Sequence, residues 1–222
     1  MFNIFLQLLL LIISVNSFKS PFLKGVHKPV KKEIQSNLII PDENIFKKIE
    51  GFYGQIGPNP KYPDTNAYSL FDGDGMIHGI FFNKTHISYH NHWVKTKKLL
   101  TEMKWGKKMY ISLAEMKGIR GLTSILTSEL MTSFQLIPTG YTANTAFLYH
   151  NDKLFALHET DTPYRINLNF ENKTIHTGRH YTFKNIITTT AHPKFDNIRK
   201  KIYLYSYSGF KANKGLFLNN IL

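Results

Sequence analysis

Histidine, aspartate and glutamate are the residues with which this chain would have to bind a metal ion, because its 222 residues include no cysteine. The same absence excludes a disulfide framework and a thiolate metal site. His90 and His92 lie two positions apart, so in an extended segment their side chains share one face. There they could chelate a metal ion together with His78 or His86. We favour the simpler interpretation, that they are ordinary strand histidines.

Two aspartates near a pair of glycines resemble part of a calcium-binding loop. Asp72, Asp74 and Gly75 have that character, but an EF-hand would require a glutamate where Asn83 stands. The sequence therefore excludes a calcium site of this type. The glycines are expected to allow a tight turn with positive φ.

The chain is strongly basic, with 28 Lys and Arg against 15 Asp and Glu and a net charge of +13. The surplus is spread along the sequence, and no arginine-rich or other nucleic-acid motif accompanies it, so we expect no nucleic-acid partner. The remaining interpretations are a solvated basic surface and a peripheral association with an anionic membrane, worth about 1 kcal/mol per well-placed cation.

The first 17 residues have the pattern of a signal peptide. Residues 4–15 are mostly apolar, and small residues follow at the positions needed for cleavage after Ser17. The apolar run is too short to span a bilayer comfortably. An uncleaved membrane anchor is the alternative.

Residues 18–37 form a second, basic segment in which residues 18–32 contain no acid. Acid-poor, basic stretches with hydroxyl groups are typical of transit peptides. A signal peptide followed by Phe18 and such a stretch is similar to the bipartite address of algae with complex plastids, which would direct the protein through the secretory pathway to the plastid. A disordered basic linker explains the segment equally well.

The body of the chain, residues 38–222, is predicted to be mostly β structure. Strands are expected at residues 51–56, 75–82 and 86–94, with a loop at 57–66 and a hairpin connection at 83–85. Helical spacing of apolar residues between 98 and 136 predicts a helical insertion. Strands resume at 145–149, 154–158, 164–170 and 202–207, where Tyr203, Tyr205 and Tyr207 share a face. Such short antiparallel strands are typical of a sandwich, a barrel or a propeller, and the spacing of the strands does not distinguish among these three folds.

Four segments resemble, in the expected order, signature motifs of the carotenoid oxygenase family, and together they cover about residues 40–208. They are Gln55-Ile56-Gly57-Pro58-Asn59-Pro60 with Ser69-Leu70-Phe71-Asp72-Gly73-Asp74-Gly75-Met76-Ile77-His78, then Asn144-Thr145-Ala146, then Lys153-Leu154-Phe155-Ala156-Leu157-His158-Glu159, and finally Thr190-Ala191-His192-Pro193-Lys194-Phe195-Asp196. One departure is Gln55, which stands where the family commonly has an arginine.

The resemblance implies a seven-bladed β-propeller, present here in part, with the helical insertion. It further implies one Fe²⁺ ion held by four histidines and a dioxygenase that uses O₂ to cleave a double bond of a carotenoid or apocarotenoid into two carbonyl products. Imidazole ligands suit iron. On this basis His192 is expected to be an iron ligand, and Glu159 to be the carboxylate that accepts a hydrogen bond from a ligand histidine.

No histidine follows His192, whereas the remaining three ligands of the family lie further along the chain. At 40 to 50 residues per blade, about 200 residues cannot close a seven-bladed ring. The sequence is therefore expected to be a fragment of an oxygenase. The alternative is a truncated, non-catalytic remnant that binds carotenoids or lipids.

Overall fold

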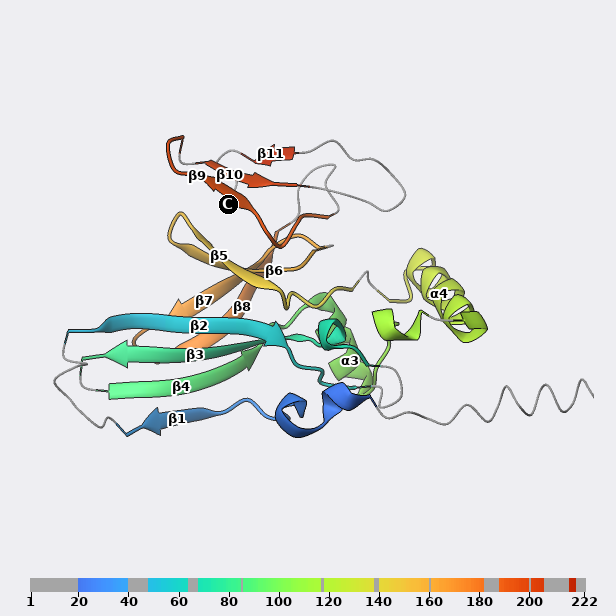
Figure 1. The fold of residues 1–222 in the computed structure, drawn as a ribbon, viewed down its shortest axis with the longest axis horizontal. Coiled ribbons are helices and arrows are strands. Elements are labelled where there is room, and N and C mark those ends of the chain that lie inside the picture. Colours follow the sequence, from blue (N-terminus) through green and yellow to red (C-terminus); the bar gives the residue numbers. More distant parts are fainter. Residues whose placement is uncertain are drawn as a thin grey trace, which may run out of the picture.

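The computed structural model describes residues 20–39, 48–63, 68–84, 86–116, 118–137, 140–159, 161–181, 188–199, 201–205 and 216–218. The expected signal peptide, residues 1–17, lies outside these ranges, as do Phe18, Lys19 and Tyr207. Within them, three antiparallel sheets follow one another along the chain (Figure 1).

The first sheet has the strand order β1-β4-β3-β2. Its strands are β1 (Gln35–Leu38), β2 (Glu50–Pro58), β3 (Gly75–Asn83) and β4 (His86–Trp93). The last three are the predicted strands, and β3 and β4 form the predicted hairpin. A short turn, η3 (Leu70–Asp72), precedes β3.

The second and third sheets are simple meanders. The second consists of β5 (Ala146–His150), β6 (Lys153–Leu157), β7 (Tyr164–Asn169) and β8 (Thr174–His180), in that order. Asn151 and Asp152 take positive φ values of 48° and 56° in the β5–β6 turn, as a tight hairpin requires. The third sheet contains β9 (Lys194–Asp196), β10 (Lys201–Leu204) and β11 (Leu216–Leu218), with β10 in the middle.

Successive sheets share hydrophobic cores. One cluster joins the first and second sheets and consists of Ile77, Phe81, Val94, Ala143, Ala156, Tyr164, Ile166 and Ile175. A second cluster joins the second and third sheets and consists of Phe155, Leu157, Ala191, Ile202 and Leu204. Sheets that pack one after another in this way are the blades of a propeller. The fold is therefore all-β, a partial propeller with a helical insertion, as predicted.

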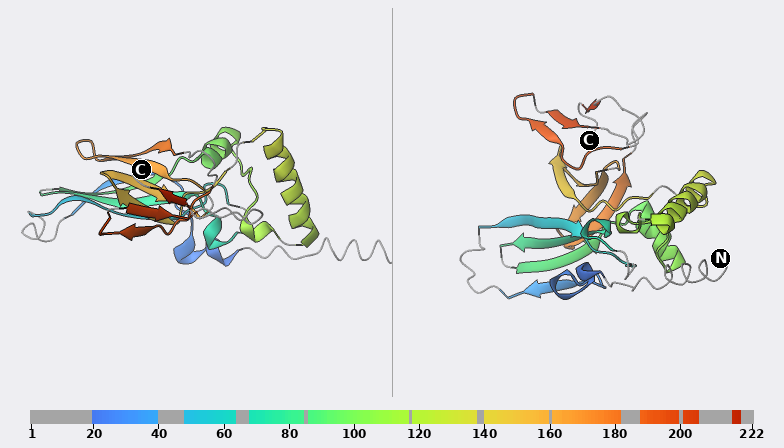
Figure 2. Two further views of the ribbon diagram at one scale, coloured as in Figure 1. Left: turned by 90° about the horizontal axis from the view of Figure 1, so that it is seen from above. Right: turned by 45° about the vertical axis from the view of Figure 1, so that its right-hand side comes forward.

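The helical insertion lies between the first two sheets in sequence. It contains α3 (Lys97–Trp105), the short turn η4 (Leu113–Glu115) and α4 (Gly118–Ser133). Thr96 caps the start of α3 by accepting a hydrogen bond from Leu99 N–H, and Gly106 ends it in the left-handed conformation. Figures 1 and 2 show α4 standing beside one end of the sheets rather than within them. No helix in the described ranges is long and apolar enough to cross a membrane.

The described part of the basic segment, residues 20–37, is folded against the first sheet, where the sequence predicts a linker or a transit-like segment. It forms η1 (Pro21–Leu23), η2 (Gly25–His27) and most of β1, which pairs with β4. Its backbone bonds to side chains of the body, since Val30 N–H donates to Asn59 Oδ1 (2.7 Å) and Ile34 N–H donates to Asn91 Oδ1 (2.5 Å). Residues 35–38 show no apolar alternation because all four are exposed at the sheet edge.

Candidate functional site

The two residues expected to serve an iron site, His192 and Glu159, lie side by side. Glu159 follows β6 and His192 precedes β9, so the loops of two neighbouring sheets bring them together. His192 Nε2 is 3.1 Å from Glu159 Oε1, and the two side chains are 67% and 35% exposed. The imidazole is therefore accessible, and one carboxylate oxygen orients it.

Thr190 joins the two residues, and sequence reasoning assigned it no role. Its hydroxyl accepts a hydrogen bond from His192 N–H (3.0 Å) and donates one to Glu159 Oε2 (3.4 Å). Thr190 N–H in turn donates to Tyr205 O, so the segment before His192 is tied to the third sheet. Its place in the Thr-Ala-His-Pro motif was the signal that could have identified it.

A buried aspartate fixes the backbone next to this pair. Asp161 is 5% exposed, its carboxylate lies 3.0 Å from His180 Nε2, and its carbonyl oxygen accepts hydrogen bonds from Thr189 N–H and Oγ1. Burial lowers the pKa of His158, and the charges of Asp161 and Glu159 oppose that shift. The His158 imidazole is thus favoured in its neutral form.

The pair offers nitrogen and oxygen donors of the kind that iron accepts. One imidazole and one carboxylate do not complete a coordination shell, and no group of three or more His, Asp or Glu among the described residues could hold a metal ion. The described residues therefore offer two possible ligand groups here and no complete metal site.

The other histidines do not gather as the first hypothesis requires. His90 and His92 do share a face of β4, but His78 pairs with Asn91 and so projects to the opposite face, where its Nδ1 lies 2.6 Å from Tyr89 Oη. His92 Nδ1 instead contacts Glu33 Oε1 at 3.0 Å. Glu33 lies in the segment expected to be a leader or linker, which explains why sequence reasoning missed it.

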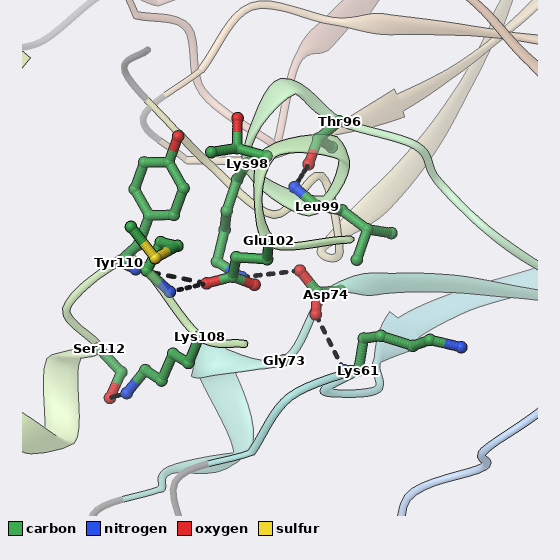
Figure 3. Close-up of polar contacts among 12 residues, drawn as sticks. Lys61, Gly73, Asp74, Thr96, Lys98, Leu99, Glu102, Lys108, Tyr110 and Ser112 are labelled. Carbon is green, nitrogen blue, oxygen red and sulfur yellow. Dashed lines mark hydrogen bonds and ion pairs between the residues drawn. The ribbon is translucent and has the colours of Figure 1, made fainter. Parts of the chain in front are cut away.

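The acidic residues of the first signature motif hold the helical insertion in place, and Figure 3 shows the contacts of one of them, Asp74. Asp74 Oδ1 accepts from Lys98 Nζ (2.8 Å), and Lys98 also donates to Glu102 Oε2 (2.7 Å). Burial alone would lower the pKa of Lys98, but Asp74 and Glu102 outweigh it and raise the pKa above its ordinary value. Asp72 accepts hydrogen bonds from the backbone N–H groups of Leu113 and Ala114 at the start of η4. Both carboxylates are thus engaged by protein groups.

The glycines of this motif are required for a reason other than the expected one. Gly73 has φ −69°, and neither it nor Gly75 has a positive φ. A Cβ atom on Gly75 would instead lie 2.1 Å from the carbonyl oxygen of Ala143. The expectation of positive φ is therefore wrong. Position 75 requires glycine because two backbone segments approach closely there.

An asparagine from the next motif completes this junction. Asn144 Nδ2 donates to the carbonyl oxygens of Phe71 (3.0 Å) and Gly73 (2.6 Å). The first two motifs therefore hold each other in place by hydrogen bonds and close packing. The last two motifs bring Glu159 and His192 together.

Comparisons with known proteins give a consistent picture. A family model described as retinal pigment epithelial membrane protein matches residues 28–219. The chain is 32% identical over 193 residues to carotenoid 9,10(9',10')-cleavage dioxygenase 1 of Arabidopsis thaliana, covering 84% of this chain and 36% of that relative. It is 32% identical over 168 residues to the probable carotenoid cleavage dioxygenase 4, chloroplastic, of the same plant, covering 72% of this chain and 28% of the relative.

Among solved structures, the lignostilbene dioxygenase of Pseudomonas brassicacearum matches with a TM-score of 0.60 and 26% identity, covering 85% of this chain and 37% of that one. The chain thus spans between 28% and 37% of the length of these three proteins.

Proposed function

The chain belongs to the retinal pigment epithelial membrane protein family, the carotenoid oxygenases, and on that premise we propose that it supplies the first blades of an iron-dependent dioxygenase. The enzyme would use O₂ to cleave a double bond of a carotenoid or apocarotenoid into two carbonyl products. Its relatives carry names of carotenoid cleavage dioxygenases, which supports this class of reaction.

The observation that carries the proposal is the contact between His192 and Glu159. His192 would bind Fe²⁺ through a ring nitrogen, and Glu159 would accept a hydrogen bond from a ligand imidazole and so fix its orientation. Thr190 holds both residues. Bound iron would supply the activation of dioxygen, and the other ligands would have to come from residues beyond the described ones.

A chimeric enzyme tests this role. Residues 28–219 would replace the matching segment of the Arabidopsis dioxygenase. Iron content and carbonyl products would be measured for this chimera and for its His192→Ala variant. We expect His192→Ala to lose iron and cleavage together. Glu159→Gln should weaken iron binding by about 10- to 100-fold, as loss of a supporting carboxylate does.

His86→Ala is the matched control, since His86 is an exposed histidine on β4 away from the pair. Circular dichroism reports whether each chimera folds. A folded His192→Ala chimera that keeps its iron would contradict the assignment.

We also propose that the outward face of α4 contacts an anionic membrane surface from which an apolar substrate is taken. Leu122, Leu126 and Leu130 follow one another at four-residue spacing and are 57%, 55% and 57% exposed. Phe134, just after the helix, is 71% exposed. An apolar helix face on a protein of net charge +13 suits binding in the interface of a negatively charged bilayer.

Vesicle sedimentation measures this association. The chain should bind phosphatidylserine vesicles better than phosphatidylcholine vesicles, and Leu126→Glu should reduce binding. Ser124→Glu adds the same charge on the other side of α4 and should not. Equal binding by the two variants would overturn the assignment of this face.

The localisation proposal is entry into the secretory pathway by residues 1–17 and delivery to a plastid. The chloroplastic relative supports the plastid. A fluorescent protein fused after residue 37 should reach the plastid of an alga with complex plastids, and should remain in the cytosol when residues 1–17 are deleted.

A further inference from the structure

A cavity between the first two sheets is lined by three of the ten histidines. It has a volume of about 310 Å³ and lies where the N-terminal segment and β4 meet β8. Its lining includes Glu33, His90, His92, Lys95 and His176. These residues are separate from the His192 and Glu159 pair.

The ring of His92 is held in one tautomer and directed by a carboxylate. The carboxylate is that of Glu33, whose Oε1 also accepts a hydrogen bond from Trp93 N–H at 2.9 Å. The ionised carboxylate can only accept, so His92 Nδ1, 3.0 Å away, carries the hydrogen. In the neutral ring, Nε2 is then the atom with the free lone pair.

That lone pair is buried without a partner. His92 is 8% exposed, and its Nε2 is shielded from solvent and has no hydrogen-bond partner among the described residues. A buried acceptor left in this state is unfavourable unless a ligand pairs with it. A histidine whose second ring nitrogen donates to a carboxylate is the arrangement found at metal sites.

A second imidazole lies next to it on the other sheet. The rings of His92 and His176 are 6.5 Å apart between centroids at an angle of 72°. His176 is exposed, and its Nε2 lies 2.9 Å from the hydroxyl of Thr174 on its own strand. Metal–nitrogen bonds are about 2.0–2.1 Å long, so His176 has to turn toward His92 for both rings to bind one ion, and its exposed position leaves room for that movement. His90 Nε2 lies 2.9 Å from Ser88 Oγ, and the binding of an ion by His92 and His176 does not require it.

We propose that His92 and His176 bind a divalent cation of the zinc type in this cavity, with Glu33 orienting His92 and water completing the coordination. Imidazole ligands select such cations over magnesium and calcium. Two protein ligands are consistent with the absence of any converging group of three in the described part of the chain. The ion links β4 to β8 and fastens the segment that carries Glu33.

Zinc titration of the full chain, purified with an affinity tag that contains no histidine, tests the site. We expect one Zn²⁺ per chain by calorimetry, and one Co²⁺ with visible absorption bands when cobalt replaces zinc. His176→Ala, at an exposed position, should abolish this binding without affecting folding. Glu33→Gln should weaken it by about 10- to 100-fold.

The controls separate this site from other histidines and from the proposed iron site. His86→Ala, exposed on the same strand, and His192→Ala should bind Zn²⁺ as the unaltered chain does. The proposal is overturned if the unaltered chain binds no stoichiometric zinc, or if His176→Ala binds it equally well. A failure here leaves the role of His192 untouched, because the two sites share no residue.

Discussion

At the scale of single residues, the signature motifs of the family contain residues required for packing as well as residues expected to serve the chemistry. Gly75 lies against the backbone of Ala143 and Thr142, and Asn144 binds the neighbouring carbonyl oxygens. A sequence motif cannot distinguish a residue required for close approach from one required for catalysis, which is why positive φ was expected at Gly75. His192 and Glu159 could be selected only through resemblance, since a lone histidine and a lone glutamate carry no geometric signal.

Gly75→Ala should destabilise the protein by at least about 1–3 kcal/mol, the usual cost of overpacking. The new Cβ would lie 2.1 Å from a backbone oxygen, which no side-chain rotation can relieve. Gly57→Ala is the matched control, because a Cβ there meets nothing within 4 Å. Urea denaturation of both variants measures the difference, and equal stabilities would contradict the packing explanation.

At the scale of elements, the strands and the helical insertion were predictable, whereas the N-terminal segment was not. Residues 98–136 show helical spacing, and the structure divides them into α3 and α4 with Gly106 ending the first helix. The edge strand β1 carries no apolar pattern, since it is held by pairing with β4 and by the residues just before it, where Val30 and Ile34 donate hydrogen bonds to Asn59 and Asn91.

Lys98→Met should detach the insertion from the first sheet at a cost of about 3–5 kcal/mol, because it leaves two buried carboxylates without their cation. Asp74 and Glu102 are 2% and 1% exposed. Lys97→Met, next in the helix but exposed, should change stability little. Thermal unfolding of the two variants provides the measurement, and a Lys98→Met protein as stable as Lys97→Met would contradict the role of this network.

The N-terminal segment should loosen in acid. The pKa of Glu33 is about 2 in the folded chain, below its ordinary value of 4.5, so its contribution to stability is present above pH 4.5 and is lost as the pH falls toward 2. Hydrogen exchange of the β1 amides between pH 5 and pH 2 should accelerate in this window beyond the intrinsic pH effect, corrected with model peptides. Glu33→Gln should remove that additional acceleration, and its persistence would point to another group.

At the scale of the whole molecule, the feature that indicates sheets stacked one on another is β6, a strand that is apolar on both faces. Ala156 of β6 belongs to the core shared with the first sheet, while Phe155 and Leu157 belong to the core shared with the third. Spacing of strands could not choose between sandwich, barrel and propeller, because all three use the same alternation. The unbroken run Leu154-Phe155-Ala156-Leu157 was the available sign that sheets pack on both sides.

Phe155→Ala should cost about 3–5 kcal/mol, as removal of a fully buried phenylalanine does. Because β6 lies between two cores, the loss should lower the stability of the second and third sheets together. Phe71→Ala, at a position that is 77% exposed, is the control. Residue-resolved hydrogen exchange is the measurement, and protection lost in the third sheet alone would argue against coupling through β6.

The placement of the two tryptophans gives the protein an internal optical reporter. Trp93 is 4% exposed, with its indole N–H bonded to Asn59 O and the Lys61 ammonium 4.0 Å from the ring centroid. Trp105 ends α3 and is 57% exposed. Emission from Trp93 is therefore expected at shorter wavelength than emission from Trp105. A single unlabelled sample can then report separately on the first sheet with its N-terminal segment and on the helical insertion.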